Sequence, residues 1–142
     1  MAEIIKVKKL SDKATLPTKA HLSDSGWDLY SSENRVLLPG QTSVIKTDIA
    51  FGIPSGHEIH IRPRSGVSTK TPLRVIFGTI DKNYTGECGV MVHNTGDTEF
   101  AIPAKYKLAQ AVLQVLPMSI MEEVDSLEET DRGSKGYGSS GV

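Results

Sequence analysis

The sequence of 142 residues predicts an all-β domain of the jelly-roll, sandwich or barrel type, followed by a flexible carboxyl-terminal arm. Three observations lead to this prediction. Apolar and polar residues alternate in several short segments, as they do in half-buried strands. Turn sequences with proline or glycine separate these segments at intervals of about 8–12 residues, which is typical of antiparallel β architectures. The last eleven residues contain too few apolar side chains to join a core.

The alternation is clearest at residues 58–62, where Ile59 and Ile61 lie between Glu58, His60 and Arg62. Residues 88–93 alternate in the same way, and four further segments are additional candidates. The expected strands, in chain order, are 3–9, 36–38, 44–49, 58–62, 88–93 and 98–102. We therefore expect one buried face along each of these strands.

Two segments have less certain secondary structure in the sequence. Residues 65–70 have the length of a single helical turn, with Ser65 or Ser68 as the capping residue. Residues 107–116 fit the helical period and the strand period equally well. Both assignments are left open at this point.

Composition excludes several classes of function. The 16 basic and 17 acidic residues give a net charge of −1, so binding to nucleic acid through a positive field is not expected. The single cysteine, Cys88, rules out an intramolecular disulfide and a cysteine-rich zinc site. No apolar run approaches the ~18 residues of a membrane span, and residues 1–10 lack the apolar segment of a signal peptide. We expect a cytoplasmic protein, of a cell or of the host of a virus, with no membrane partner.

Composition changes near residue 122. Six acidic residues and no basic ones occupy residues 122–131, and four glycines and three serines follow in residues 132–142. Such a sequence does not build a core. We expect a β domain over 1–121, and an acidic linker with a glycine-rich arm over 122–142.

The arm has the chemistry of a phosphate-binding segment. Glycine amides approach an anion closely, Ser139 and Ser140 add hydroxyl donors, and Arg132 adds positive charge. Tyr137 has an aromatic face on which a base stacks. The segment matches GxGxxG literally, but no strand precedes it and no helix follows, so it is not a dinucleotide fingerprint. A mobile tail without a ligand is the alternative.

Three further positions have a functional and a structural interpretation. Arg64, Ser65 and Gly66 follow a predicted strand and could form a second anion site, or a turn with a surface arginine. Asp81 is a candidate catalytic acid, but its carboxylate could also bond its own turn. Asp28 is an isolated acid to which the same alternative applies.

Five segments occur in one order along nearly the whole chain. They are Ser25-Gly-Trp-Asp-Leu29, Pro63-Arg-Ser-Gly66, Gly78-Thr-Ile-Asp-Lys-Asn-Tyr-Thr-Gly86, Lys107-Leu-Ala-Gln110 and Arg132-Gly-Ser-Lys-Gly-Tyr-Gly-Ser-Ser-Gly141. This series resembles the five motifs of the trimeric deoxyuridine triphosphatases. The resemblance implies a jelly-roll fold, a homotrimer whose subunits share their active sites, and Mg²⁺-dependent hydrolysis of dUTP to dUMP and pyrophosphate.

The resemblance also implies roles for individual residues. Asp81 resembles the catalytic aspartate that contacts the sugar 3′-hydroxyl and orients the attacking water, and Tyr84 resembles the aromatic residue beneath the deoxyribose. Asp28 would hold Mg²⁺ through water. The other substrate-binding positions are Gly78, Thr79, Ile80 and Gly89 for uracil, Arg64, Ser65, Gly66 and Gln110 for phosphates, and Arg132, Tyr137, Gly138, Ser139 and Ser140 in a closing lid.

Ser25, Trp27, Lys107, Lys135 and Tyr137 differ from the commonest family pattern, and none of these differences removes a reacting group. Two alternatives remain open beside the triphosphatase. One is a dCTP deaminase, which shares the fold and needs a general base near the cytosine amino group. The other is a protein that binds a regulatory partner and uses the nucleotide as a switch.

Overall fold

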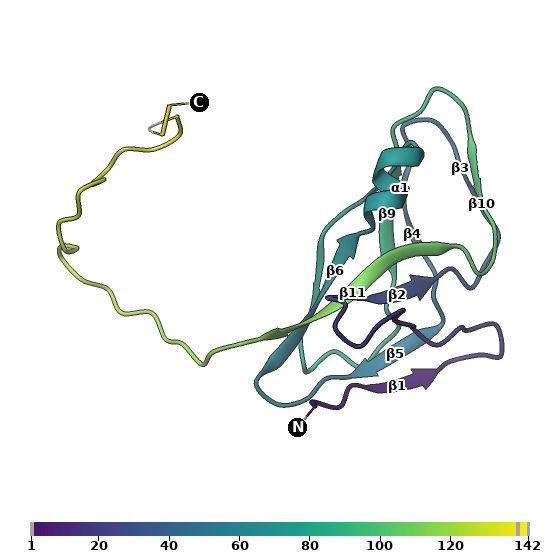
Figure 1. The fold of residues 1–142 in the computed structure, drawn as a ribbon, viewed down its shortest axis with the longest axis horizontal. Coiled ribbons are helices and arrows are strands. Elements are labelled where there is room, and N and C mark those ends of the chain that lie inside the picture. The colour runs from purple at the N-terminus through teal and green to yellow at the C-terminus, as the bar shows by residue number, and fades with distance from the viewer. Residues whose placement is uncertain (1, 139, 142) are drawn as a thin grey trace.

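The computed structural model describes residues 2–138, 140 and 141. This part of the chain contains short strands and a single helix (Figure 1). In chain order the elements are β1 (Lys6–Lys9), β2 (Trp27–Tyr30), β3 (Arg35–Leu37), β4 (Thr42–Ile45), β5 (Ile49–Gly52), β6 (His57–Pro63), α1 (Ser65–Lys70), β7 (Leu73–Val75), β8 (Gly78–Ile80), β9 (Val90–Asn94), β10 (Phe100–Ile102) and β11 (Lys107–Val115).

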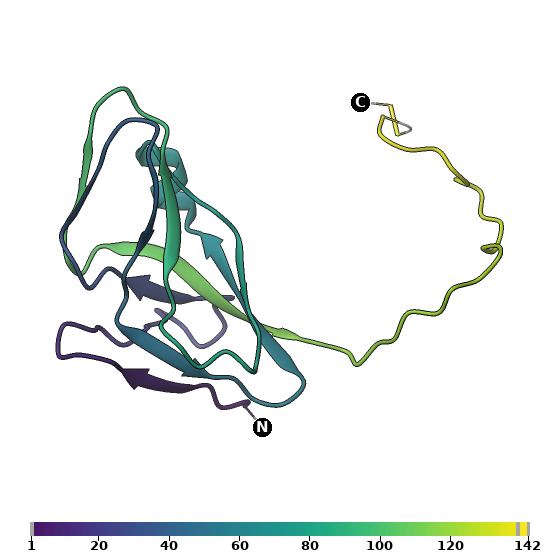
Figure 2. The same ribbon diagram turned by 180° about the vertical axis from the view of Figure 1, so that it is seen from behind.

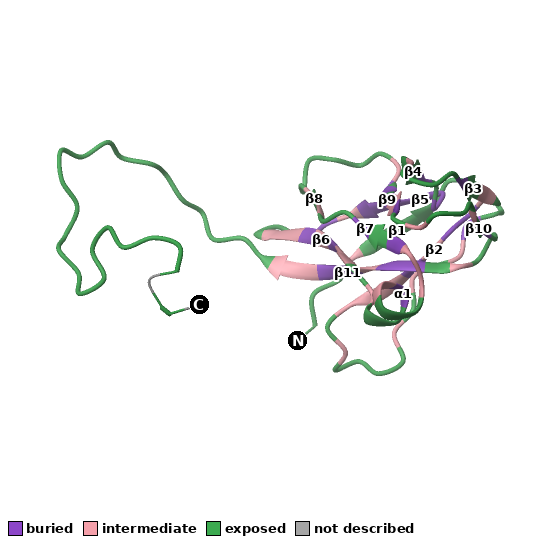
Figure 3. Ribbon diagram, turned by 90° about the horizontal axis from the view of Figure 1, so that it is seen from above, coloured by how far each residue is buried: buried purple, intermediate pink, exposed green. Residues whose placement is uncertain are grey.

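The strands form two principal sheets. One has the order β2-β11-β6-β8 and the other the order β4-β9-β7, and two further pairs are β1-β5 and β10-β3. Every pairing is antiparallel. Seen from above, β11 and β4 lie in different layers, with buried residues on strands of both layers (Figure 3). The structure confirms the predicted all-β, jelly-roll-like sandwich.

The core lies between the layers and follows the predicted alternation. Ile59 and Ile61 of β6 are buried, as are Val90 and Val92 of β9. One polar side chain is fully buried with them. Asn94 donates its amide hydrogens to the carbonyl oxygens of residues 37 and 98, at 3.1 and 3.0 Å, so its burial leaves no donor unpaired.

One strand prediction needs correction, and one assignment that the sequence left open is resolved. The expected strand 44–49 is wrong as one element, because β4 ends at Ile45 and β5 begins at Ile49. The turn between them contains Asp48, whose φ of 55° lies in the left-handed region. The segment 107–116 is resolved in favour of a strand, because β11 pairs with β6 over seven residues and with β2 along its other edge. Burial against two neighbours outweighs the helical period.

The short helix is present over the expected residues, but its cap differs from the prediction. The N-cap residue is Arg64 rather than Ser65 or Ser68, and it makes no side-chain capping hydrogen bond. The amide of Ser68 donates to the carbonyl oxygen of Arg64 at 3.1 Å. The N–H groups of the first turn therefore have no acceptor within the helix and remain available to a ligand.

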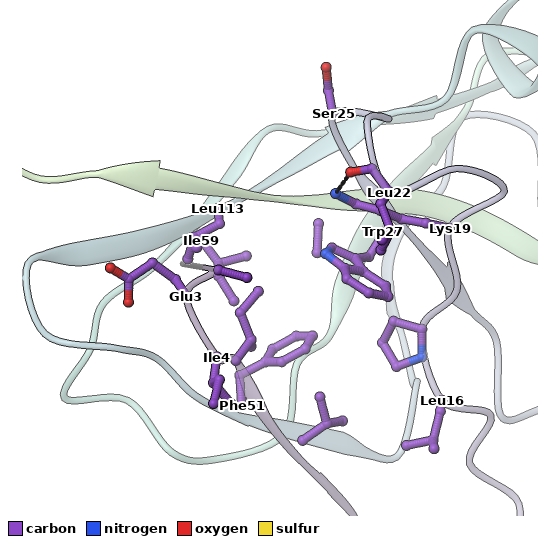
Figure 4. A pocket seen from close by; sticks show the side chains of 15 residues that line it. Glu3, Ile4, Leu16, Lys19, Leu22, Ser25, Trp27, Phe51, Ile59 and Leu113 are labelled. Atoms are coloured by element: carbon purple, nitrogen blue, oxygen red, sulfur yellow. Dashed lines mark hydrogen bonds between the residues drawn. The ribbon is translucent and has the colours of Figure 1, made fainter.

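One apolar cavity in the described part of the chain has a volume of about 800 Å³. Figure 4 shows Trp27 and Phe51 inside this pocket, with Leu16 and Leu22 from the loop before β2. The Nζ of Lys19 lies 5.0 Å from the centroid of the Trp27 ring and covers one side of it. This pocket contains none of the carboxylates or arginines of the five sequence motifs.

Beyond β11 the chain leaves the sandwich. The last backbone hydrogen bond to the body runs from the amide of Leu116 to the carbonyl oxygen of Gly56, at 2.7 Å. Residues 117–138, 140 and 141 form no strand or helix and are exposed to solvent. Figure 1 and Figure 2 show this segment extending away from the sheets. None of the helices in the described residues has the length and apolar character needed to cross a lipid bilayer.

Candidate functional site

The predicted site residues of the folded body lie in two clefts, which share no lining residue among those described. The first, here named the α1 cleft, has a volume of about 290 Å³. Its lining is Lys19, Ala20, Asp24, Ser25, Gly26, Asp28, Arg64, Ser65, Gly66 and Gln110. The second, here named the β8 cleft, has a volume of about 410 Å³. Its lining is Val44, Thr79, Ile80, Asp81, Tyr84, Glu87, Cys88 and Gly89.

Strand register builds the α1 cleft. In the sheet, Asp28 of β2 is opposite Gln110 of β11, and Gln110 is opposite Arg62 of β6. Strand β6 then leads directly into α1, so Ser65 and Gly66 face the same cleft. Three segments that are distant in the sequence thus place an acid, an amide and the open end of a helix together.

Asp28 is shared between two cations. The Nε of Arg64 donates to Oδ1 of Asp28 at 2.9 Å, and the Nζ of Lys107 lies 3.8 Å from Oδ2. All three side chains keep solvent contact, so each pairing contributes at most about 1 kcal/mol and is easily exchanged. Two positive charges on one carboxylate leave an excess of positive charge, which suits an anionic ligand.

Gln110 is fixed by two close neighbours. Its Nε2 donates to the carbonyl oxygen of Pro63 at 3.0 Å. A Cβ atom on Gly26 would lie only 2.2 Å from Oε1 of Gln110, so residue 26 must be glycine for this side chain to pack there. The glycine of the first motif therefore has a packing role that the sequence alone does not reveal.

The α1 cleft fits a hydrated magnesium ion. The described residues contain no group of three or more histidine, cysteine and acidic side chains that would enclose a metal. Asp28 and Asp24 nevertheless both line this cleft. Mg²⁺ commonly binds through one or two carboxylates, retained water and the phosphates of a substrate, which matches this donor set.

The β8 cleft presents backbone groups at a sheet edge. Strand β8 pairs with β6 along one side and is the last strand of its sheet. Thr79 and Ile80 of this strand line the cleft, together with Gly89. Gly78 lines an adjoining cavity of about 180 Å³, which also contacts Thr79, Ile80 and Gly89. An edge strand offers free N–H and C=O groups, the kind of donors and acceptors that a planar base needs.

Asp81 begins an exposed loop at the rim of this cleft. The amide of Tyr84 donates to the backbone carbonyl oxygen of Asp81 at 3.0 Å, so the turn is closed by main-chain atoms. Within the described part of the chain, the carboxylate of Asp81 has no hydrogen-bond partner. The structure therefore does not show the Asp81 carboxylate stabilising its own turn.

Tyr84 and Cys88 flank the same cleft with different properties. The Tyr84 ring is half exposed, and its hydroxyl donates to the carbonyl oxygen of Glu87 at 2.8 Å. Burial raises the pKa of the Cys88 thiol to about 12. The thiol is therefore protonated at neutral pH and is not a nucleophile.

The arm residues do not reach either cleft within this chain. Arg132 donates from Nε to the carbonyl oxygen of Lys135 at 2.8 Å, a contact internal to the arm. The side chain of Tyr137 is fully exposed. Gly138 and Ser140 lie in the same distant segment, and Ser139 is outside the described residues (Figure 1).

Three residues with no role assigned from the sequence lie in or beside one of the two clefts. Lys107 belongs to the fourth motif, where only its difference from arginine was apparent, and it pairs with Asp28. Lys19 lines the α1 cleft, and no pattern in the sequence marks it. Glu87 lines the β8 cleft directly after the third motif, and that adjacency was the available signal.

Comparison with known proteins relates this geometry to a family. The dUTPase family model matches residues 12–141. The deoxyuridine 5′-triphosphate nucleotidohydrolase of Clostridioides difficile is 41% identical over 139 residues, which are 96% of this chain and 97% of the relative. The rice enzyme of the same name (Oryza sativa subsp. japonica) is 37% identical over 142 residues, 100% of this chain and 83% of the relative.

Solved structures agree with the sequence comparison. The dUTPase of Staphylococcus bacteriophage 80alpha with dUpNHpp has a TM-score of 0.93 and 32% identity, covering 99% of this chain and 100% of that one. A variant dUTPase of phage phi11 of S. aureus, described with a structural Mg(II) ion, has a TM-score of 0.85 and 30% identity, covering 89% and 100%. With the family model spanning nearly its full length, this chain belongs to the dUTPase family.

Proposed function

We propose that this protein hydrolyses dUTP to dUMP and pyrophosphate with the help of Mg²⁺, in active sites shared between subunits of a homotrimer. The observation that carries the proposal is the pair of clefts. One of them joins Arg64 and Lys107 around Asp28, as an anion site requires. The other holds the free carboxylate of Asp81 beside Tyr84, as a nucleoside site with a general base requires.

In this proposal the β8 cleft binds the nucleoside. The edge of β8 reads uracil through backbone groups of Gly78, Thr79 and Ile80, together with Gly89, which lines the same cleft. The Tyr84 ring lies against the deoxyribose. A ribose 2′-hydroxyl pressed against that ring would lose water and gain no partner, which costs roughly 1–3 kcal/mol.

Asp81 supplies the base. Its exposed carboxylate is free to accept a proton from a water molecule, and a side chain with no competing partner is free to orient toward the substrate. Positioned general-base catalysis contributes about 10²–10⁴ in rate. The attacking water loses its proton to Asp81 as the oxygen bonds to phosphorus, and pyrophosphate leaves.

The α1 cleft binds the phosphates. Arg64 provides a planar fork for phosphate oxygens, Ser65 and Gly66 provide first-turn amides, and Gln110 provides a neutral donor. Asp28 holds Mg²⁺ through water. When bound there, the ion would neutralise charge on the phosphate chain, which the near-neutral protein does not do by its overall field.

Assembly brings the two clefts together in this proposal. The clefts share no described lining residue, and the arm lies far from both within one chain. Three apolar side chains between β11 and the arm are fully or almost fully exposed, namely Met118, Ile120 and Met121. Exposed apolar side chains of this kind are expected in a segment that contacts a second subunit. A trimer that contributes each part from a different subunit accounts for these observations.

The arm closes the completed site. We assign residues 1–121 to the catalytic domain, whose folded body ends at Leu116, and 122–142 to a linker and lid, with Tyr137 stacked on the base. Arg132, Gly138, Ser139 and Ser140 contact phosphates. Closure excludes water and fixes the α-phosphate for attack.

Pyrophosphate release tests this function. The purified protein is incubated with dUTP, dTTP, dCTP and UTP in the presence of Mg²⁺, and again with a chelator. We expect release from dUTP alone at a high rate, and little release from any nucleotide without the metal. Ammonia release from dCTP would identify a deaminase, and no turnover of dUTP would refute the proposal.

A further inference from the structure

The loop that carries Asp81 and Tyr84 is exposed along residues 81–86 and returns to the body at Glu87. The backbone at this return point determines where the Tyr84 ring lies. Its hydroxyl donates to the carbonyl oxygen of Glu87 at 2.8 Å. A Cβ atom on Gly86 would lie 2.7 Å from the Tyr84 hydroxyl oxygen and 2.8 Å from Cζ, so the ring is packed directly over residue 86.

The side chain of Glu87 ties this return point to the turn between β4 and β5. Oε1 of Glu87 accepts a hydrogen bond from the Nζ of Lys46 at 3.0 Å, and Oε2 accepts one from the backbone amide of Asp48 at 2.9 Å. The main chain repeats the connection, because the amide of Cys88 donates to the carbonyl oxygen of Ile49 at 2.8 Å. Both carboxylate oxygens of Glu87 are thus used to hold one end of the Tyr84 loop.

The turn that receives Glu87 is itself rigidly supported. The buried carboxylate of Asp48 accepts hydrogen bonds from the hydroxyls of Ser11 and Ser32, the latter at 3.0 Å. These bonds come from two other parts of the chain, ahead of β2 and directly after it. A charged acceptor with two hydroxyl donors is a strong anchor. The connection therefore runs from a fixed, buried turn through Glu87 to an aromatic ring on an exposed loop.

From these contacts we infer that Glu87, held by Lys46 and the amide of Asp48, is the positioning residue for Tyr84 and sets the selectivity for deoxyribose over ribose. The inference rests on the proposed function and deepens it at the same site. Rejection of a 2′-hydroxyl requires that the ring cannot retreat from the sugar. Displacements of about 1 Å at a binding site change rates by up to about 10²-fold, so the anchor of the ring is part of the selectivity.

A purely structural role for Glu87 makes a different prediction. A carboxylate that only stabilises the fold would, when removed, lower the melting temperature and leave the ratio of kcat/KM for dUTP over UTP unchanged. A positioning residue lowers that ratio, because the loosened ring admits ribose while the deoxyribose loses contact. The ratio separates the two roles independently of stability.

The experiment compares Glu87→Gln and Lys46→Met with the matched control Glu33→Gln. Oε2 of Glu33 also accepts a hydrogen bond from a backbone amide of the same turn, that of Lys46, at 2.9 Å. Its side chain is 26% exposed against 28% for Glu87, and nothing links it to Tyr84 in the described contacts. We expect the dUTP/UTP ratio to fall about tenfold in the first two variants, and to stay at the wild-type value in Glu33→Gln. Lys46→Arg, which keeps the charge, should retain more of the ratio than Lys46→Met.

A second comparison tests whether the effect passes through the ring. In a Tyr84→Ala background the ratio is already reduced, and adding Glu87→Gln should lower it no further. An unchanged ratio in Glu87→Gln, or a further loss in the double variant equal to the loss in the single one, would overturn the inference. Neither result touches the proposed function, which fails only if the wild-type protein does not release pyrophosphate from dUTP.

Discussion

Arg64 and Asp28 are joined in the α1 cleft by a hydrogen bond of 2.9 Å from Nε to Oδ1. This pair connects the residue before the helix with the strand β2, 36 positions earlier in the chain. In the proposed function both groups would exchange partners when a triphosphate binds with Mg²⁺, since the arginine would then face phosphate and the carboxylate the hydrated ion. The pairing in the free protein keeps each group in place and leaves neither charge without a partner.

Replacing Asp28 tests this exchange. In Asp28→Asn the cations Arg64 and Lys107 lose their partner, while the contact to the hydrated metal is weakened. We expect the Mg²⁺ concentration for half-maximal activity to rise about 10–100-fold. Binding of pyrophosphate without metal should become tighter at the same time, because the cleft gains net positive charge. Steady-state rates over a magnesium titration and calorimetry with pyrophosphate measure the two effects.

Glu99→Gln provides the control for Asp28→Asn. Glu99 is an exposed acid just before β10 and lines neither cleft. It changes the net charge of the protein by the same amount. An identical magnesium dependence in wild type and Asp28→Asn would remove Asp28 from the metal site.

Asp81→Asn should separate chemistry from binding. The Asp81 side chain is exposed and makes no hydrogen bond within the described residues, so the substitution should change stability by less than about 0.5 kcal/mol. Asparagine keeps the size of the side chain but does not accept the proton of the attacking water. We expect kcat to fall by about 10²–10⁴ and the affinity for a non-hydrolysable dUTP analogue to stay close to wild type. Single-turnover rates and calorimetry measure both quantities, and a near-wild-type kcat would exclude Asp81 as the base.

The sequence predicted strands such as β6 and β9 because one face of each is buried, whereas the residues of β1, which lies within the expected strand 3–9, are all exposed. Alternation of apolar side chains is visible over five residues at 58–62, but three-residue strands such as β7 and β8 are too short to display a period. The segment 44–49 was predicted as one strand because apolar residues stand at both of its ends. The carboxylate of Asp48 accepts bonds from Ser11 and Ser32, and those distant partners create the turn.

The sequence predicted which types of residue form the site, but not which of these residues contact one another. Motif order identified Asp28 and Arg64 of the α1 cleft and Asp81 of the β8 cleft, but not the acids Asp24 and Glu87 that line them as well. It did not reveal that they form two clefts, nor that Lys107 pairs with Asp28 or Glu87 with Lys46. The last of these contacts joins residues 41 positions apart. Contacts at such separations depend on how the sheets pack, and a single sequence without its fold does not specify them.

Subunit exchange should restore activity if the active sites are shared. A chain carrying Asp81→Asn retains its arm, and a chain lacking 132–142 retains Asp81. In a mixed trimer, some sites then draw Asp81 from one chain and the arm from the other. We expect pyrophosphate release from dUTP to appear after the two inactive proteins exchange subunits.

The control for this exchange is a chain that carries both lesions. Mixed with Asp81→Asn, it should restore nothing, because no subunit in that mixture supplies an intact Asp81. Recovery in the first mixture that is no greater than in the control, or a monomer by light scattering, would contradict shared sites.

Acid should destabilise the protein partly through Asp48. The hydroxyl of Ser11 and that of Ser32 hold the pKa of the Asp48 carboxyl below its ordinary value of 3.8. A depressed pKa contributes stability that is complete above the unfolded value and is lost as the pH falls through the folded one. Asp48→Asn should therefore lower the free energy of unfolding at pH 7 by about 1–2 kcal/mol, and this difference should shrink below pH ~4. Melting temperatures at a series of pH values measure it, and a constant difference down to the lowest pH would contradict the assignment.

The arm should act on rate far more than on affinity. The described residues beyond Leu116 make no hydrogen bond to the body, so ordering them on a substrate has an entropic cost of ~1–2 kcal/mol per residue. Stacking of Tyr137 on the base returns about 1–3 kcal/mol, and each charge-assisted bond from Arg132 to phosphate about 1.5–3 kcal/mol. The cost of ordering is at least as large as these gains, so the arm is not expected to add much to the affinity. Closure of the site, by contrast, fixes the α-phosphate and excludes water.

Deleting residues 132–142 should consequently leave the melting temperature nearly unchanged while kcat falls by about 10²-fold or more. The affinity for a non-hydrolysable dUTP analogue should fall only severalfold, because the arm is not expected to add much to it. Tyr137→Phe keeps the stacking surface and serves as the control, with a kcat close to wild type, whereas Tyr137→Ala should resemble the deletion in part. Stopped-flow rates and calorimetry on the four proteins distinguish these outcomes. A truncated enzyme with full kcat, or an arm equally mobile by NMR with and without the analogue, would show that the arm does not close the site.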